Sequence, residues 1–136
     1  DDLPFVAVII MGKIKAQESL NPSLVFKDES DERFALKLFR NTINNNKDYE
    51  DIIVKFSKNW ELERIAIMDQ LFLKMAFAEI FSMEDLPVKV SMNEYIEISK
   101  YYGGPKSKLF VNGLLDNVVK TYTREGKLKK VGRGLI

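Results

Sequence analysis

The sequence predicts an all-α protein, a compact bundle of about six helices that forms one domain over residues 1–136. Apolar side chains recur three and four residues apart along almost the whole chain, which is the spacing of a helix that buries one face. No segment alternates persuasively between apolar and polar residues, as a half-buried strand does. The breaks between helical segments are short, so the helices are expected to pack against one another.

The first predicted helix begins at Asp2, whose side chain can cap it, with Pro4 in the first turn, where a missing N–H costs nothing. Val6, Ile10 and Ile14 line one face of this helix. A Pro-containing break then ends the pattern before the next segment.

A second helix is expected to begin near Ser30 or Asp31 and to end at the three asparagines of residues 44–46. Phe34, Leu38 and Thr42 lie on one face of it, and Ala35, Phe39 and Ile43 lie beside them. A third, shorter segment follows. Its apolar stripe has the i, i+3, i+4, i+7 spacing of a helix: Tyr49, Ile52, Ile53 and Phe56.

Residues 60–82 are predicted to form the central helix, because this segment is apolar on most sides and therefore belongs inside the bundle. Phe72 and Met75 are expected to be fully buried. Three charged residues interrupt the apolar segment and are expected at the rim of the bundle: Asp69, Lys74 and Glu79.

The last two helices have recognisable ends. Ser91 and Glu94 have the spacing of a capping box, which predicts that a helix begins at Ser91. Gly103 is expected to end that helix in the left-handed conformation, and Pro105 to start the next one. The inner face of the last helix is predicted to carry four side chains: Phe110, Leu114, Val118 and Tyr122.

Composition argues against catalysis. The chain contains no cysteine and no histidine, which excludes disulfides and thiolate metal sites and removes the commonest general base. The nearest acidic set for a carboxylate-based enzyme is Glu61, Glu63 and Asp69, but Asp69 lies about two helical turns from Glu61, too far to share a metal or a proton. The composition therefore disfavours an enzyme, without excluding one, and no metal site is expected.

The charge is divided unevenly along the chain. Residues 1–87 carry 11 basic and 16 acidic side chains, whereas residues 88–136 carry 10 basic and 4 acidic ones. The basic half favours an anionic partner. Residues 123–136 are expected to form a flexible basic tail, and for this tail alone a simple solvated charge run is favoured. The longest apolar run, residues 5–11, is far shorter than the about 20 residues of a membrane-spanning helix. With no secretory signal visible, a cytoplasmic protein without membrane contact is expected.

Three stretches of the sequence resemble the NusB family of transcription antitermination factors. The first corresponds to the central helix of that family, the second to its proline turn and the following Asn-Glu helix, and the third to its Phe-Val-Asn-Gly signature. They read ERIAIMDQLFLKMAFAEI (63–80), LPVKVSMNEYIEISKYYGG (86–104) and KSKLFVNGLLDNVV (106–119). Their order and spacing together are specific, and residues 31–45 resemble the preceding family helix more weakly.

The resemblance implies a NusB-like helical fold and a role in reading RNA polymerase through terminators, chiefly in ribosomal RNA operons. NusB-like proteins bind single-stranded boxA RNA together with NusE, a small ribosomal protein that also belongs to the elongation complex. No cofactor is implied. The resemblance implies that Lys74 and Phe110 bind RNA and that Glu63 and Asp69 bind the protein partner. Lys106 and Lys108 are added to the expected RNA-binding residues because they lie beside Phe110 at a helix N-terminus, where backbone N–H groups also favour phosphate.

Simpler interpretations of these residues stay open. Periodicity alone makes Phe110 a core residue beside Leu114, and each lysine a solvated surface charge. Residues 1–26 do not resemble the arginine-rich start of the family and contain only two basic residues, Lys13 and Lys15. Either the parent chain is longer or this member has diverged. The alternatives are a structural adaptor without autonomous RNA binding and the NusB-like domain of a ribosomal RNA methyltransferase.

Overall fold

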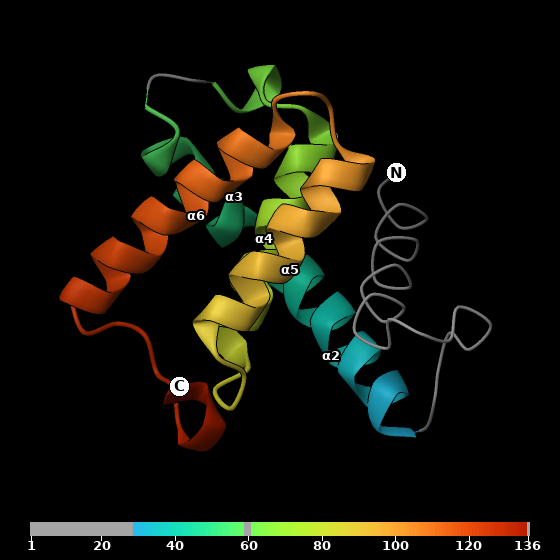
Figure 1. The fold of residues 1–136 in the computed structure, drawn as a ribbon, viewed down its shortest axis with the longest axis vertical. Coiled ribbons are helices and arrows are strands. Elements are labelled where there is room, and N and C mark those ends of the chain that lie inside the picture. Colours follow the sequence, from blue (N-terminus) through green and yellow to red (C-terminus); the bar gives the residue numbers. More distant parts are fainter. Residues whose placement is uncertain (1–28, 59–60, 136) are drawn as a thin grey trace.

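The computed structural model describes residues 29–58 and 61–135, which form a helical bundle without a strand in these ranges (Figure 1). The all-α prediction is therefore confirmed. The elements are α2 (Glu29–Asn44), α3 (Asn46–Phe56), the 3-10 turn η1 (Leu62–Arg64), α4 (Ile67–Ser82), α5 (Val88–Tyr102), α6 (Ser107–Arg124) and the 3-10 turn η2 (Gly132–Leu135). The first predicted helix lies outside the described residues. None of the described helices is long and apolar enough to cross a membrane.

Helix α4 is the centre of the bundle and packs against α2, α3, α5 and α6. Every residue from 71 to 80 is buried, and Phe72 and Met75 have no exposed surface, as predicted. The helix begins at Ile67, later than predicted, because the chain first forms η1 and then an extended link. The Gln70 side chain donates to the carbonyl oxygens of Leu62 and Ile65, both at 2.9 Å, and so fastens η1 to the start of α4.

The prediction that the charged residues of α4 lie at the rim of the bundle is wrong for all three: Asp69, Lys74 and Glu79. Lys74 and Glu79 tolerate burial because other helices supply polar partners. Asp69 tolerates burial because it lies in the first turn of α4, where the helix end stabilises its charge. Lys74 forms an ion pair of 3.0 Å with Glu50 of α3. The carboxylate of Glu79 accepts hydrogen bonds from α5.

Helix α5 begins at Val88, three residues before the predicted start, so the capping-box interpretation of Ser91 is wrong. The Ser91 hydroxyl donates instead to Oε1 of Glu79 at 2.9 Å, because it lies on the inner face of α5. The end of the helix also differs from the prediction. Gly103 has a φ of −97°, which is not left-handed, and the glycine is required by close packing. A Cβ atom there would lie 2.5 Å from Cβ of Ser107 and 2.7 Å from the Ser99 carbonyl oxygen.

Helix α6 buries Leu114 and Val118, as predicted, but leaves Phe110 and Tyr122 half-buried. The segment after it folds back toward the α4–α5 connection (Figure 1). There the Lys130 ammonium donates to the Met83 carbonyl oxygen at 2.8 Å. These contacts place the segment against the α4–α5 connection. The expectation that it is a flexible tail stays a prediction.

Candidate nucleic-acid interface

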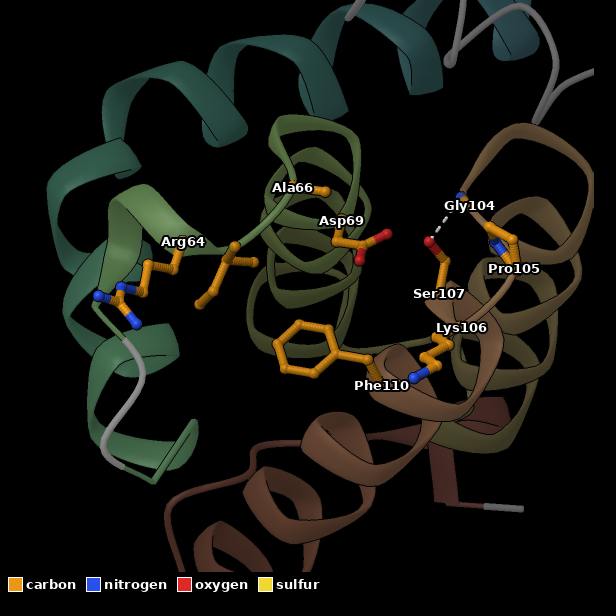
Figure 2. Close-up of a pocket in the computed structure, with 9 residues that line it drawn as sticks. Arg64, Ala66, Asp69, Gly104, Pro105, Lys106, Ser107 and Phe110 are labelled. Atoms are coloured by element: carbon orange, nitrogen blue, oxygen red, sulfur yellow. Dashed lines mark hydrogen bonds between the residues drawn. The ribbon is translucent and has the colours of Figure 1, made fainter.

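A cleft of about 510 Å³ opens between the start of α4 and the turn that joins α5 to α6. Figure 2 shows Asp69, in the first turn of α4, facing Ser107 at the start of α6, while the side chain of Arg64 extends away from them. The lining of the cleft is largely apolar, with a few polar and charged groups: Arg64, Ile65, Ala66, Asp69, Gly104, Pro105, Lys106, Ser107 and Phe110. Residues far apart in the sequence therefore meet at this end of the bundle.

Two helix N-termini meet at the cleft. The N-cap residues of α4 and α6, Ala66 and Lys106, both line it, and neither has a side-chain cap hydrogen bond. The first backbone N–H groups of a helix lack partners within the helix, and the aligned peptide dipoles place partial positive charge there. The exposed side chain of Lys106 adds a full positive charge. The start of α6, which has no acidic residue in its first turn, is therefore suited to an anionic group such as a phosphate, whereas the start of α4 carries the carboxylate of Asp69.

The α5–α6 turn fixes one wall of the cleft. The backbone N–H of Gly104 donates to the Ser107 hydroxyl oxygen at 2.8 Å (Figure 2). The missing side chain of Gly103 allows Ser107 to lie this close to the end of α5. Ser107 is buried, and its hydroxyl proton has no hydrogen-bond acceptor among the described residues. The turn thus presents a hydroxyl group that is able to donate into the cleft.

Asp69 forms the opposite polar group. Its side chain was expected on an exposed acidic surface, but only 8% of the residue is exposed, because it lies beneath the α5–α6 turn. Its Oδ1 atom has no hydrogen-bond partner in the described part of the chain. Figure 2 shows the carboxylate directed toward Ser107, whereas the guanidinium of Arg64 is directed away from it. Because Asp69 lies in the first turn of α4, the helix N-terminus stabilises its negative charge.

The predicted site residues fall into three groups. Phe110 and Lys106 line the cleft together with Asp69, and Lys108 is exposed in the first turn of α6. Glu63 is exposed on η1, one residue from the lining. Lys74 does not belong to this surface.

The expected exposure of Lys74 on an RNA-facing patch is wrong, because its ammonium is buried against Glu50 on the α3 side of α4. Arg64 and Ser107 were missed in the sequence. The only signals for them were their places next to a helix start, and helix starts elsewhere in the chain have such residues as well.

Comparisons with known proteins agree on one family. A sequence profile of the NusB family matches residues 10–120. The family likeness therefore reaches into the first 26 residues, where the sequence patterns had suggested none. The solved structure of T. maritima NusB has a TM-score of 0.70 and 25% identity to this chain, with 90% of this chain and 93% of that one covered.

Three relatives carry the name transcription antitermination protein NusB. The one from Salinibacter ruber is 44% identical over 110 residues, with 81% of this chain and 69% of the relative covered. The one from Chloroherpeton thalassium is 40% identical over 122 residues, with 90% of this chain and 58% of the relative covered. The one from Dictyoglomus turgidum is 41% identical over 97 residues, with 71% of this chain and 67% of the relative covered.

Proposed function

This chain belongs to the NusB family, and from that membership we propose that it acts as a transcription antitermination factor. In this proposal it binds single-stranded RNA of the boxA type together with the small ribosomal protein NusE, as part of the RNA polymerase elongation complex. The names of its relatives support the antitermination role. The cleft between α4 and α6 supports the RNA contact. No cofactor and no catalytic residue take part.

The observation that carries the RNA-binding proposal is the joint position of two helix N-termini, basic side chains and an aromatic ring. Lys106 and Lys108 are exposed at the start of α6, where they can contact phosphates. Phe110 is half-buried at the cleft wall, which leaves part of its ring available to an unpaired base. Aromatic stacking and phosphate contacts are the two interactions that single-stranded RNA offers most readily.

Glu63 is the residue that we assign to the protein partner. It is exposed on η1, and an exposed carboxylate can attract a basic ribosomal protein during encounter. The burial of Asp69 makes it unsuitable for the same open surface. The reversal Glu63→Lys should slow association with the ribosomal protein, most strongly at low salt, where screening is weakest. An unchanged association rate at low salt would remove this assignment.

The RNA proposal is tested by titrating a boxA-type RNA at several salt concentrations with the Lys106→Ala/Lys108→Ala variant. The slope of log K against log salt is negative, and each lost phosphate contact should make it less steep by about 0.7. The matched control is Lys89→Ala/Lys120→Ala, which removes two exposed lysines near the other ends of α5 and α6. Equal slopes for the two variants would contradict the proposed interface. Binding of the ribosomal protein without any binding of RNA would identify an adaptor instead.

A further inference from the structure

We propose that Tyr101 and Tyr102 form a stacking surface for unpaired RNA bases, beside the cleft and in addition to Phe110. This inference rests on the proposed RNA-binding function and adds to it two residues that hold bases. The observation behind it is the exposure of the two rings at the end of α5, 68% for Tyr101 and 57% for Tyr102. In the described part of the chain they are the two exposed aromatic side chains, whereas Phe110 is half-buried.

The two rings belong to a larger apolar surface at this end of the bundle. Among the described residues, the four most exposed large apolar side chains lie at the end of α5 and at the starts of α4 and α6: Leu109, Tyr101, Ile67 and Tyr102. Figure 1 shows these three helix ends together at one end of the bundle. Single exposed apolar residues are normal on a protein surface, but a group of them at one end indicates a binding surface.

The charge around the rings favours RNA as the partner. Residues 98–115 contain three lysines and no acidic residue. Lys100, Lys106 and Lys108 are all exposed, and the Lys100 ammonium lies 5.6 Å from the centre of the Tyr101 ring. These positive charges attract phosphates and repel a basic ribosomal protein. A polyanion that also carries flat apolar groups fits this combination, and single-stranded RNA is such a partner.

The positions of the charges indicate the direction in which the RNA strand leaves the rings. Glu97 is exposed one helical turn before Tyr101, so its carboxylate would repel a phosphate on that side. Lys106 and Lys108 follow the rings along the chain, at the start of α6. The strand should therefore run from the rings toward α6 and the cleft, and not back along α5.

The rings of Tyr101 and Tyr102 offer separate faces. Successive side chains on a helix point about 100° apart, so these two rings cannot enclose one base between them. Each ring is instead available to a base of its own. Every base has a flat face, so stacking of this kind tolerates any sequence and requires only that the bases are unpaired.

The first test is the double variant Tyr101→Leu/Tyr102→Leu, titrated with the single-stranded boxA-type RNA. Leucine keeps an apolar side chain at both positions but cannot stack. The affinity should therefore fall by about fivefold or more, the lower end of what one stacked base contributes. No charge changes, so the salt dependence should be that of the unaltered chain. An unchanged affinity in this variant would overturn the proposal.

Two further variants show whether the rings themselves are responsible. Tyr101→Phe/Tyr102→Phe keeps both rings and should keep the affinity. The matched control Leu36→Ala/Val54→Ala removes exposed apolar side chains from α2 and α3 and should leave RNA binding unchanged. Thermal unfolding of all three double variants checks that they fold. A loss of affinity in the control as large as that in the leucine variant would contradict the assignment.

The second test compares the single-stranded RNA with the same RNA annealed to its complement. The duplex presents phosphates but hides its bases in the stack. The loss of affinity in Tyr101→Leu/Tyr102→Leu should therefore be confined to the single strand. Equal losses for the two RNAs would mean that the substitutions act on the phosphate contacts, and the stacking surface would be refuted.

The outcomes separate this proposal from the RNA-binding function on which it rests. If the leucine variant binds RNA normally while Lys106→Ala/Lys108→Ala shows a less steep salt dependence, the stacking surface is wrong and the RNA-binding function stands. If the unaltered chain binds no RNA with or without the ribosomal protein, both are wrong. If the leucine variant loses the ribosomal protein but keeps RNA, the tyrosines contact protein, and the base assignment is overturned.

Discussion

The hydroxyl of Tyr95 on α5 donates to Oε2 of Glu79 on α4 at 2.6 Å, and neither residue has any exposed surface. The hydroxyl of Ser91 donates to the other carboxylate oxygen, Oε1, at 2.9 Å. A carboxylate inside a bundle is tolerated only when its oxygens are hydrogen-bonded. These two contacts therefore fix α5 in one position on α4, and α5 in turn carries the turn that forms the cleft.

Removal of the Tyr95 hydroxyl should destabilise the fold. Tyr95→Phe keeps the ring but leaves Oε2 of Glu79 without this donor, which should lower the free energy of unfolding by about 1–3 kcal/mol. Urea denaturation measures the change. Tyr102→Phe removes the same group from an exposed position and should change the stability by less than about 0.5 kcal/mol. Equal effects of the two variants would show that the Glu79 contact contributes nothing.

Stability should also fall at alkaline pH. Burial, and next the charge of Glu79, hold the pKa of Tyr95 well above its ordinary value of 10.0. Burial, and next Asp48, raise the pKa of Tyr49 to about 12. A proton held more tightly in the folded state stabilises it fully below the unfolded pKa, and this stabilisation is lost as pH rises through 10 toward the folded pKa.

The measurement is the free energy of unfolding between pH 8 and about 12, the upper limit set by the raised pKa of Tyr49. Tyr95→Phe should make the alkaline decline less steep, because one of the two buried phenols is gone. A decline of the same steepness in this variant would mean that other groups cause it.

The helical period located the helices because it depends only on neighbours along the chain, but the partners of the buried charges come from distant segments. Lys74 is paired with a residue 24 positions away, and Glu79 with one 16 positions away. No local spacing reveals such pairs, so these residues resembled rim charges. The capping-box spacing at Ser91 was misleading for the same reason. The Ser91 hydroxyl donates a hydrogen bond to Glu79 and does not cap a helix start.

The candidate site was predictable in part. Lys106 and Phe110 are near neighbours on one helix start, so the sequence alone places them together. The position of Asp69 opposite them depends on how α4 and α6 pack, and this packing depends on contacts across the whole bundle. A local pattern can therefore predict that Lys106 and Phe110 lie together, but it cannot predict that the Asp69 carboxylate faces them.

The ion pair between Lys74 and Glu50 should be structural. Lys74→Ala removes the cation and leaves the Glu50 carboxylate, which is 24% exposed, without its partner. The free energy of unfolding should fall by about 2–4 kcal/mol, since breaking a largely buried pair strongly destabilises a fold. The salt slope of RNA binding should stay unchanged, because Lys74 lies away from the cleft. A less steep salt dependence with unchanged stability would restore Lys74 to the RNA interface.

Phe110→Leu should separate stacking from phosphate attraction. Leucine keeps an apolar side chain at the cleft wall but cannot stack on a base, so the loss of RNA affinity should correspond to about 1–3 kcal/mol. No charge changes, and the slope of log K against log salt should therefore be that of the unaltered protein. Fluorescence anisotropy at four salt concentrations measures both quantities in one series.

Phe56→Leu is the matched control for this prediction. Phe56 is also half-buried, but it packs beside Tyr122, with ring centroids 6.3 Å apart, and does not line the cleft. Each substitution should cost less than about 1.5 kcal/mol of stability, because both replace one apolar side chain by a slightly smaller one. Only Phe110→Leu should weaken RNA binding. If both variants bind RNA as tightly as the unaltered chain, Phe110 acts as a packing residue, and the attraction of RNA to this end of the bundle comes from its positive charges.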